Sequence, residues 1–439
     1  MTVEIRIMVI EPIDGLLGGQ IRQMGFDCRS LSAPEMGEAD LNERLIVIDG
    51  SYERPEREAV LAAAHAAPQL MPVILAGPAE RIHQPAIVDE LRGGRIDFVI
   101  QTPFTPSQFH SHIKSLARFA NIRAEFGRRA AVLARFGRAM APMPADATIS
   151  PHTAALLVAG SGRYFNAIEK SLAPDMQVFG ALTPELAMDR LAEGGITALV
   201  LDMSAEPFAD AIAFLRRLRR DARYFHLPVI LIPLADNSDG DDRFYEEGVT
   251  DILHPPLEAQ ALLVSLLPLM RIALFREALK TAYEEARSNP VADALTGLYS
   301  RGVLLTHLQQ LIDDGAGFSI ALLSVDNMAV INGEFGYAGG DMILRQIGKA
   351  IELLTRGEDM AARFSGSEFA LLMPETGEIA ANAALRRILS VLRHTSFSPG
   401  PGMITVEVEF GGGAVEKQQG ESPELMLSRA KALYRYPCR

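Results

Sequence analysis

Arg356 and Asp359, three positions apart in this 439-residue chain, form the residue pair with the most specific chemistry. A guanidinium group can donate to O6 and N7 of a guanine, while a carboxylate accepts from its N1–H and N2–H edge. The spacing therefore predicts a turn that holds a guanine from two sides. A pair of this kind is also common as a surface ion pair worth about 0.5 kcal/mol, so the neighbouring residues decide between the two interpretations.

A short polar stretch, Ser-Gly-Ser-Glu-Phe at 365–369, follows this pair, and an apolar run at 370–373 comes directly after it. Glycine between two strand-like segments predicts a tight hairpin turn. The stretch resembles the hairpin of the GGDEF diguanylate cyclase family, which usually reads Gly-Gly-Asp/Glu-Glu-Phe. In that family the third residue is a metal-binding acid, and Ser367 occupies its position here. Glu368 matches the Glu at the fourth position of the family hairpin.

Two further segments carry the same resemblance. Residues 293–301, Asp-Ala-Leu-Thr-Gly-Leu-Tyr-Ser-Arg, match the opening motif of the family at every position except the Asn that precedes the final Arg. Ser324-Val-Asp326 ends a predicted buried strand where the family has Asp-x-Asp, so Ser324 replaces a second metal carboxylate. Because hard cations prefer carboxylate oxygens to hydroxyls, we expect no bound metal here, no required cofactor and no catalysis.

The resemblance also implies two nucleotide sites. Arg356 and Asp359 correspond to the family's product site, with Arg387 on the following helix as their third partner and its neighbour Arg386 as a fallback. In the family this site binds cyclic di-GMP as an intercalated dimer, and arginine planes can stack on its guanines. We therefore expect cyclic di-GMP as the ligand, whereas Arg363 is interpreted as structural.

Asn332 and Asp341 stand at the positions that read the substrate guanine in the family. The resemblance therefore implies residual guanine binding at these two residues. On the residues alone, Asn332 could equally be a turn residue and Asp341 a helix N-cap. Both interpretations stay open.

The first 140 residues contain short apolar runs at 5–10, 45–48, 72–75 and 97–100. Continuous apolar runs are typical of strands buried on both faces, and their spacing leaves room for intervening helices. This pattern predicts a doubly wound parallel sheet, with a ligand site at the carboxyl ends of its strands. The unit resembles a response-regulator receiver domain of two-component signalling and phosphorelay systems.

Asp49 ends the second of these runs and corresponds to the phosphoacceptor of receiver domains. The family holds Mg²⁺ with paired acids after the first strand, whereas this chain has Glu11 followed by a proline. Gly77 and Thr102 replace the expected hydroxyl and lysine. An acyl phosphate needs such partners to neutralise and hold its oxygens, so Mg²⁺ binding here has little support. A phosphoacceptor and an ordinary strand-end aspartate both stay open for Asp49.

Residues 150–270 repeat this pattern, with apolar runs at 155–159, 198–201 and 228–232. Asp202 ends the second run at the acceptor position, but no acid pair follows the first run and Pro255 replaces the lysine. We therefore expect dimerisation or adaptor duty in place of phosphorylation. His254 is interpreted as a loop histidine whose hydrogen bonds are satisfied.

The predicted architecture is α/β: two receiver-like doubly wound parallel-sheet domains at 1–140 and 150–270, then a helical linker at 271–290 and a degenerate GGDEF α+β domain at 291–439. The formal net charge of −13 and the pI near 5.3 argue against a nucleic-acid partner, which requires a basic face. Cys28 and Cys438 are the only cysteines, which argues against a disulfide framework. We expect no membrane span and a cytoplasmic location.

The resemblance implies a non-catalytic cyclic di-GMP receptor of the response-regulator type. The resemblance also implies a homodimer that recruits protein partners through its receiver-like domains, and a role at the cell pole in cell-cycle-regulated proteolysis. Two alternatives stay open. One is a weak or phosphorylation-gated diguanylate cyclase whose metal is held by Asp326 and Glu368. The other is a dimeric scaffold that binds no nucleotide.

Overall fold

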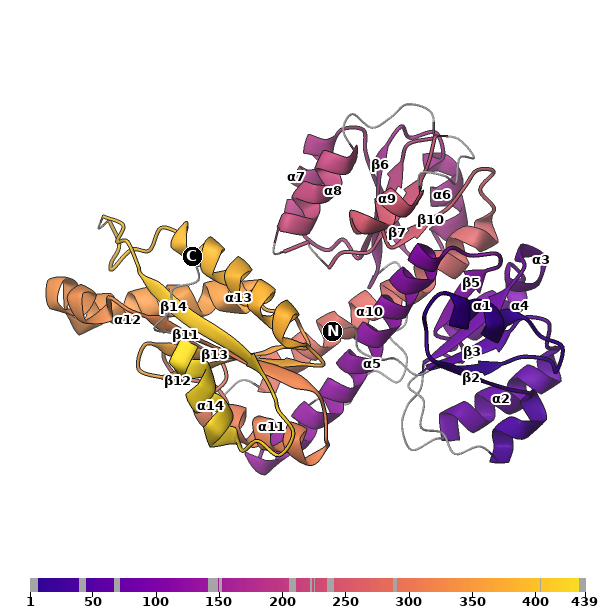
Figure 1. Ribbon diagram of the computed structural model, residues 1–439. Helices are drawn as coiled ribbons and strands as arrows, with labels where there is room; N and C mark the ends of the chain where they lie inside the picture. The colour runs from indigo at the N-terminus through magenta and orange to yellow at the C-terminus, as the bar shows by residue number, and fades with distance from the viewer. Residues whose placement is uncertain are drawn as a thin grey trace. The chain divides into compact units, whose positions relative to one another are not determined.

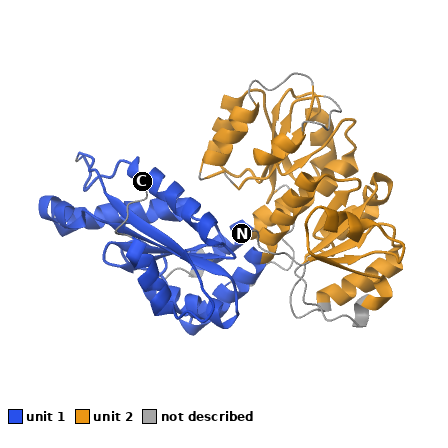
Figure 2. Ribbon diagram, viewed as in Figure 1, with its two compact units in different colours: residues 1, 121–143, 276–439 blue, residues 2–120, 144–275 orange. Residues whose placement is uncertain are grey.

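The structure is a computed structural model that describes residues 7–38, 45–66, 72–140, 149, 152–204, 211–221, 223–224, 226–234, 241–286, 290–402 and 404–433. Cys438 lies outside these residues. The chain divides into two compact units, coloured separately in Figure 2: residues 2–120 with 144–275, and residues 121–143 with 276–439 and residue 1. Two long helices, α5 (Pro106–Arg135) and α10 (Ala259–Ala286), contribute residues to both units.

The first receiver-like domain is a parallel five-stranded sheet in the order β2-β1-β3-β4-β5. The predicted apolar runs form β1, β3, β4 and β5, and nearly every residue in them is buried. The strands are β1 (Ile7–Ile10), β2 (Cys28–Leu31), β3 (Leu45–Asp49), β4 (Val73–Gly77) and β5 (Phe98–Gln101). Between them lie α1 (Leu17–Gln23), η1 (Ala33–Glu38), α2 (Arg54–Ala66), α3 (Ala79–Ile82) and α4 (Pro85–Arg92).

The second receiver-like domain repeats this topology, with a parallel sheet in the order β7-β6-β8-β9-β10. Its strands are β6 (Ala155–Gly160), β7 (Gln177–Ala181), β8 (Ala198–Asp202), β9 (Val229–Ile232) and β10 (Asp251–Ile252). Its helices are α6 (Phe165–Leu172), α7 (Pro184–Ala192), α8 (Ala211–Arg220) and α9 (Asp241–Glu246). The predicted doubly wound repeat is confirmed, since both sheets share the order 2-1-3-4-5.

The third domain is built on an antiparallel sheet in the order β12-β13-β11-β14. Figure 1 shows α11 and α14 on one face of this sheet and α13 on the other. Adjacent glycines of β14 show why both faces are covered closely: a Cβ on Gly412 would meet Leu385 of α13, and one on Gly413 would meet Leu433 just after α14. The elements are α11 (Arg301–Asp313), β11 (Phe318–Val325), α12 (Met328–Leu354), β12 (Met360–Ser365), β13 (Glu368–Pro374), α13 (Glu378–Arg393), β14 (Phe410–Glu416) and α14 (Pro423–Ala432).

The end of α5 belongs to the core of this third domain. Val132 and Leu133 are fully buried and pack in one cluster with residues of α11, α14 and the sheet. The sequence pattern had placed residues up to 140 with the first receiver-like domain. Helical periodicity shows which face of α5 is apolar but not which domain covers that face, so this packing was not predictable from the pattern.

Candidate nucleotide-binding site

The Arg356–Asp359 pair lies on a turn between α12 and β12. The turn is closed by the backbone, since N–H of Asp359 donates to the carbonyl oxygen of Arg356 at 3.2 Å. Glycine at 357 permits a close approach of α10, because a Cβ there would lie 2.7 Å from Cγ of Arg276. The predicted turn is therefore present, and its second residue is constrained by packing against a neighbouring helix.

Asp359 presents a carboxylate whose hydrogen bonding is incomplete. Its Oδ1 is shielded from solvent and has no hydrogen-bond partner within the described part of the chain. Burial raises the pKa of Asp359 to about 7; Arg356 opposes this rise and Glu358 adds to it. A buried acceptor without a partner is costly, so this oxygen is suited to receive an N–H group from a ligand.

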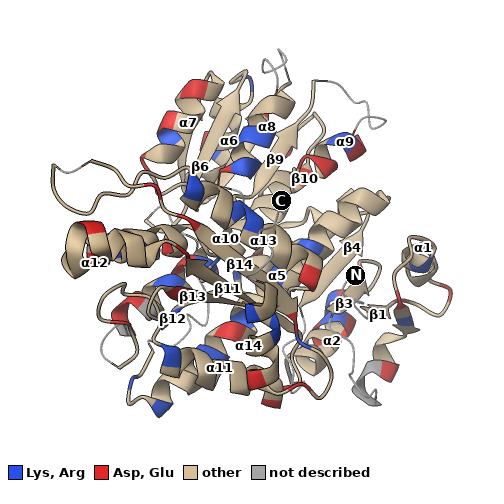
Figure 3. Ribbon diagram, turned by 60° about the vertical axis from the view of Figure 1, so that its left-hand side comes forward, with Lys and Arg blue, Asp and Glu red and all other residues tan. Residues whose placement is uncertain are grey.

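Arg387 comes to the same place from α13. Burial lowers the pKa of Arg387, the positive charge of Arg356 lowers it further, and the carboxylate of Asp359 acts in the opposite direction. The neighbouring Arg386 is exposed instead. Two guanidinium groups and one carboxylate, the set expected for the product site, therefore lie close enough to act on one another electrostatically. Figure 3 shows the Lys and Arg residues of α13 in blue.

Behind this turn lies a buried polar network that sequence reasoning missed. Nη2 of Arg129 on α5 donates to the backbone carbonyl oxygens of Glu358 at 2.7 Å and Asp359 at 2.9 Å. Its Nε donates to Oε1 of Glu125 at 2.9 Å, and Nε2 of His307 lies 2.7 Å from the same oxygen. Arg129 precedes Asp359 by 230 positions, so no local spacing pattern in the sequence could have paired them.

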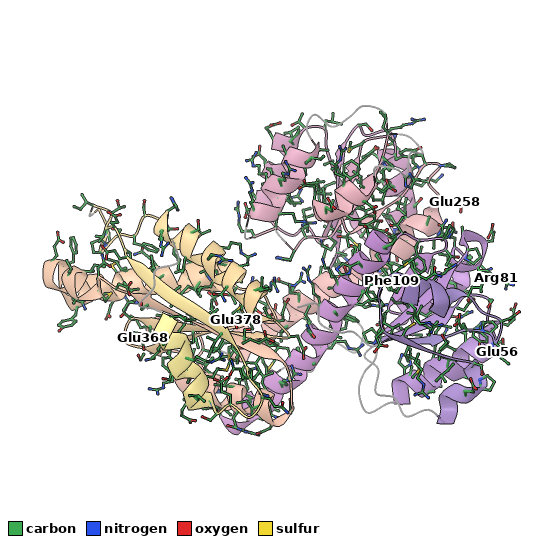
Figure 4. The ribbon with its side chains drawn as sticks, in the orientation of Figure 1. Glu56, Arg81, Phe109, Glu258, Glu368 and Glu378 are labelled. Atoms are coloured by element: carbon green, nitrogen blue, oxygen red, sulfur yellow. The ribbon has the colours of Figure 1, made fainter. Side chains whose placement is uncertain are left out.

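The hairpin lies at the other end of β12. Ser324 on β11 pairs in register with Glu368, which opens β13 and is labelled in Figure 4. The hydroxyl of Ser324 donates to Oδ1 of Asp326 at 2.5 Å. Oε2 of Glu368 accepts from Ser365 Oγ at 2.6 Å and lies 3.0 Å from Nζ of Lys431. The ammonium group of Lys431 therefore lies beside the carboxylate of Glu368 in the hairpin.

Asn332 and Asp341 flank a break in α12, where Gly336 has φ 73° and ψ 170°. The absence of a side chain at Gly340 allows the two segments to approach, since a Cβ there would lie 1.9 Å from Oδ1 of Asn332. The fold thus brings Asn332 against the residue next to Asp341. Asn332 and Asp341 each lie inside a helical segment of α12. The interpretation of Asn332 as a turn residue and that of Asp341 as a helix N-cap are therefore wrong.

Comparisons with known proteins identify the family that the third domain matches. Residues 291–436 match the sequence model of the family described as "Diguanylate cyclase, GGDEF domain". The third domain is a GGDEF domain. Response regulator PleD of Caulobacter vibrioides is 27% identical over 354 residues, which cover 78% of this chain and 76% of PleD. Diguanylate cyclase VdcA of Vibrio cholerae is 32% identical over 158 residues, which cover 35% of this chain and 46% of VdcA.

Among solved structures, the chain is similar to the GGDEF domain of DgcB from Caulobacter crescentus in complex with c-di-GMP. That match has 25% identity and a TM-score of 0.31, and it covers 34% of this chain and 88% of DgcB's crystallised chain.

Divalent cations are implied by the GGDEF family, but the donor set at this hairpin does not suit them. The two positions expected to carry metal carboxylates are Ser324 and Ser367, whose hydroxyls are weak ligands for hard cations. A cation at Glu368 would compete with Lys431 for the carboxylate. Within the part of the chain that the structure describes, no three His, Cys, Asp or Glu residues are grouped as metal ligands.

In the first receiver-like domain, Asp49 ends β3 and Glu11 directly follows β1, and each accepts a hydrogen bond from a nearby backbone N–H group. Asp49 is half-buried and its Oδ1 accepts from N–H of Ser51 at 2.8 Å. Glu11 is buried and accepts from N–H of Gly18 at 3.0 Å, so its carboxylate is turned toward α1. Among the described residues, neither Asp49 nor Glu11 belongs to a group of three His, Cys, Asp or Glu side chains that could hold a metal ion.

Asp202 is fully buried, and its carboxylate accepts hydrogen bonds from the loop that follows β8. Its Oδ1 accepts from N–H of Ser204 at 3.0 Å and from the hydroxyl of the same residue at 2.6 Å. His254 in the same domain lies 2.8 Å from Oδ2 of Asp241.

In the third domain, Arg363 donates to the carbonyl oxygen of Gly366 and to Asp293. These bonds link the hairpin to the opening motif of the GGDEF domain.

Proposed function

We propose that the protein is a non-catalytic cyclic di-GMP receptor that binds its ligand at Arg356, Asp359 and Arg387. The observation that carries this proposal is the buried Oδ1 of Asp359, which has no hydrogen-bond partner among the described residues and lies near the guanidinium groups of Arg356 and Arg387. The N1–H and N2–H edge of a guanine supplies the missing donors, and the two arginines match its acceptor edge and the phosphates.

The absence of catalysis is the second part of the proposal. Condensing two GTP molecules requires cations that neutralise the triphosphates, and serine replaces carboxylate at both expected metal positions. The ammonium group of Lys431 beside Glu368 further disfavours a cation there. The similarity to VdcA, which is named a diguanylate cyclase, supports the alternative of a weak cyclase. GTP turnover with Mg²⁺ or Mn²⁺ at high protein concentration distinguishes the two, since any cyclic di-GMP formed refutes the non-catalytic assignment.

The receiver-like domains serve assembly in this proposal. Arg92 and Asp175 form an ion pair of 2.8 Å between them, and Ser111 on α5 donates to the carbonyl oxygen of Thr250 at 2.9 Å. These contacts join the two receiver-like domains within one chain. We propose that the joined pair acts as an adaptor that forms a homodimer and recruits other proteins. This combination resembles PopA-like response regulators, the non-catalytic paralogues of PleD, and by that resemblance implies polar localisation and a role in cell-cycle-regulated proteolysis. In the described residues, no helix is long and apolar enough to cross a bilayer.

Calorimetric titration of the full chain with cyclic di-GMP tests the site. We expect micromolar or tighter binding, abolished in Arg356→Ala and Arg387→Ala and retained in Arg386→Ala, the matched control for an exposed neighbour on the same helix. GTP serves as the control ligand. The absence of cyclic di-GMP binding by the wild-type protein would refute the receptor assignment; a dimer that persists under those conditions would then favour the scaffold.

A further inference from the structure

The backbone of the ligand turn is held by a charged side chain from outside the GGDEF sequence. Arg129 is only 3% exposed, and its Nη2 is shared between the two consecutive carbonyl oxygens of Glu358 and Asp359. A charge-assisted hydrogen bond to a buried carbonyl is stronger than a neutral one. Because these carbonyls flank the peptide that carries Asp359, their anchoring restricts the directions in which its side chain can point.

Arg129 is itself oriented by a second set of buried charges. Glu125 and His307 are both fully buried, and the Glu125 carboxylate lies between the His307 ring and Nε of Arg129. Burial alone raises the pKa of Glu125, but its interactions with His307 and Arg129 outweigh this and lower it. A planar guanidinium can satisfy the carboxylate through Nε and the carbonyls through Nη2 at the same time, whereas a lysine ammonium is a single point donor.

The opposite side of the turn is limited by α10. Gly357 packs directly against the side chain of Arg276, whose Nε lies 3.8 Å from Oε2 of Glu358. The ligand turn is thus contacted by one arginine from each of the two long helices. α5 is a continuous helix that begins at Pro106, just after the last strand of the first receiver-like sheet.

We propose that Arg129 is a positioning residue for the cyclic di-GMP site, so that ligand occupancy and the docking of α5 on the GGDEF domain stabilise each other. This inference rests on the proposed ligand site. Coupling between two binding events is reciprocal: whatever affinity the docked helix adds to the ligand, the ligand adds to helix docking. A change in α5 that withdraws Arg129 therefore weakens ligand binding without touching a residue that contacts the ligand.

The test compares Arg129→Lys with Arg135→Met in the full chain. Arg135 lies on the same helix and donates from its surface position to Gln310 at 3.0 Å, which makes it the matched control. We expect Arg129→Lys to weaken the calorimetric Kd for cyclic di-GMP about tenfold or more, and Arg135→Met to leave it unchanged. Thermal unfolding of each variant shows whether it is folded. A folded Arg129→Lys with the wild-type Kd overturns the proposal.

Hydrogen exchange provides a readout that a purely structural role of Arg129 would not change. In the wild type, cyclic di-GMP should slow exchange in peptides covering 356–360 and also in those covering 121–135. In Arg129→Lys the ligand should protect the first region only. Protection limited to 356–360 in the wild type would mean that the two sites are uncoupled, and would refute the inference.

Two further experiments cover the cases in which Arg129→Lys does not fold or the wild type binds no cyclic di-GMP. If Arg129→Lys does not fold, the double variant Glu125→Gln with Arg129→Met removes the stranded buried charge, while the carbonyls still lose their donor. If the wild type binds no cyclic di-GMP, the proposed function fails but the positioning claim is still measurable. In ligand-free protein, Arg129→Lys should speed exchange at 357–360 and Arg135→Met should not; equal exchange in all three proteins overturns the claim.

Discussion

Raising the pH from about 6 to about 8 should tighten cyclic di-GMP binding about tenfold, because Asp359 must be ionised to accept both guanine N–H groups. Burial raises the pKa of this carboxyl to about 7. Roughly one carboxyl in eleven is therefore ionised one pH unit below that value, and about ten in eleven one unit above it. The tenfold difference in the ionised, binding-competent form corresponds to ~1.4 kcal/mol of binding free energy.

The groups that face Asp359 set the direction of this effect. Arg356 and Arg129 favour the ionised form, whereas burial and Glu358 disfavour it more strongly. A guanine edge adds two donors to the ionised form, so binding lowers the pKa and releases a proton below about pH 7. Neither the phosphodiesters nor the guanines of the ligand titrate in this range, so the released proton reports on the protein.

Calorimetry in two buffers of different ionisation enthalpy measures both quantities at each pH. Close to one proton released per bound guanine edge is expected at the acidic end, falling toward zero at the alkaline end. Asp359→Asn is the matched control, since an amide of similar shape does not titrate and should give a weak, pH-independent Kd. A wild-type Kd that does not change with pH, together with no proton release, would refute the assignment of this carboxylate to guanine recognition.

The same carboxyl predicts the opposite trend for the stability of the ligand-free protein. Its pKa in the folded state is raised above the ordinary value of 3.8, so its contribution is fully present below 3.8 and is lost as the pH rises through about 7. The unfolding temperature of the ligand-free protein should therefore fall over this window relative to Asp359→Asn. Saturating cyclic di-GMP should raise the unfolding temperature more at the alkaline end than at the acidic end.

Three substitutions probe the surroundings. Gly357→Ala forces a Cβ to within 2.7 Å of Arg276 Cγ, so it should lower the unfolding free energy by about 1–3 kcal/mol and weaken ligand binding, as seen by denaturation and calorimetry. Lys431→Ala removes a partly exposed ion pair and should change stability by no more than about 1 kcal/mol, with GTP turnover still undetectable. Asp202→Asn leaves a donor of Ser204 without its charged acceptor inside the core and should cost about 1–3 kcal/mol in chemical denaturation. An unchanged midpoint for Asp202→Asn would contradict its assignment as a loop-stabilising residue.

Local sequence determined much of the architecture. The strands β1, β3, β6 and β8 could be located from apolar runs because a strand covered on both faces must be apolar throughout. The hairpin could be located because a residue at positive φ in a two-strand turn favours glycine, and Gly366 has φ 44°. The Arg356–Asp359 turn could likewise be predicted, since its closing hydrogen bond joins residues three apart.

The tertiary structure decided what surrounds these local features. Neither the ion pair of Lys431 with Glu368 nor the bonds of Arg129 to the ligand turn could be predicted, because each joins segments distant in sequence through the packing of helices on a sheet. The α5 helix illustrates the reason. Periodicity identifies its apolar face, but Val132 and Leu133 could have been buried against any domain. Only their insertion into the core of the GGDEF domain brings Arg129 to the turn that the sequence had identified.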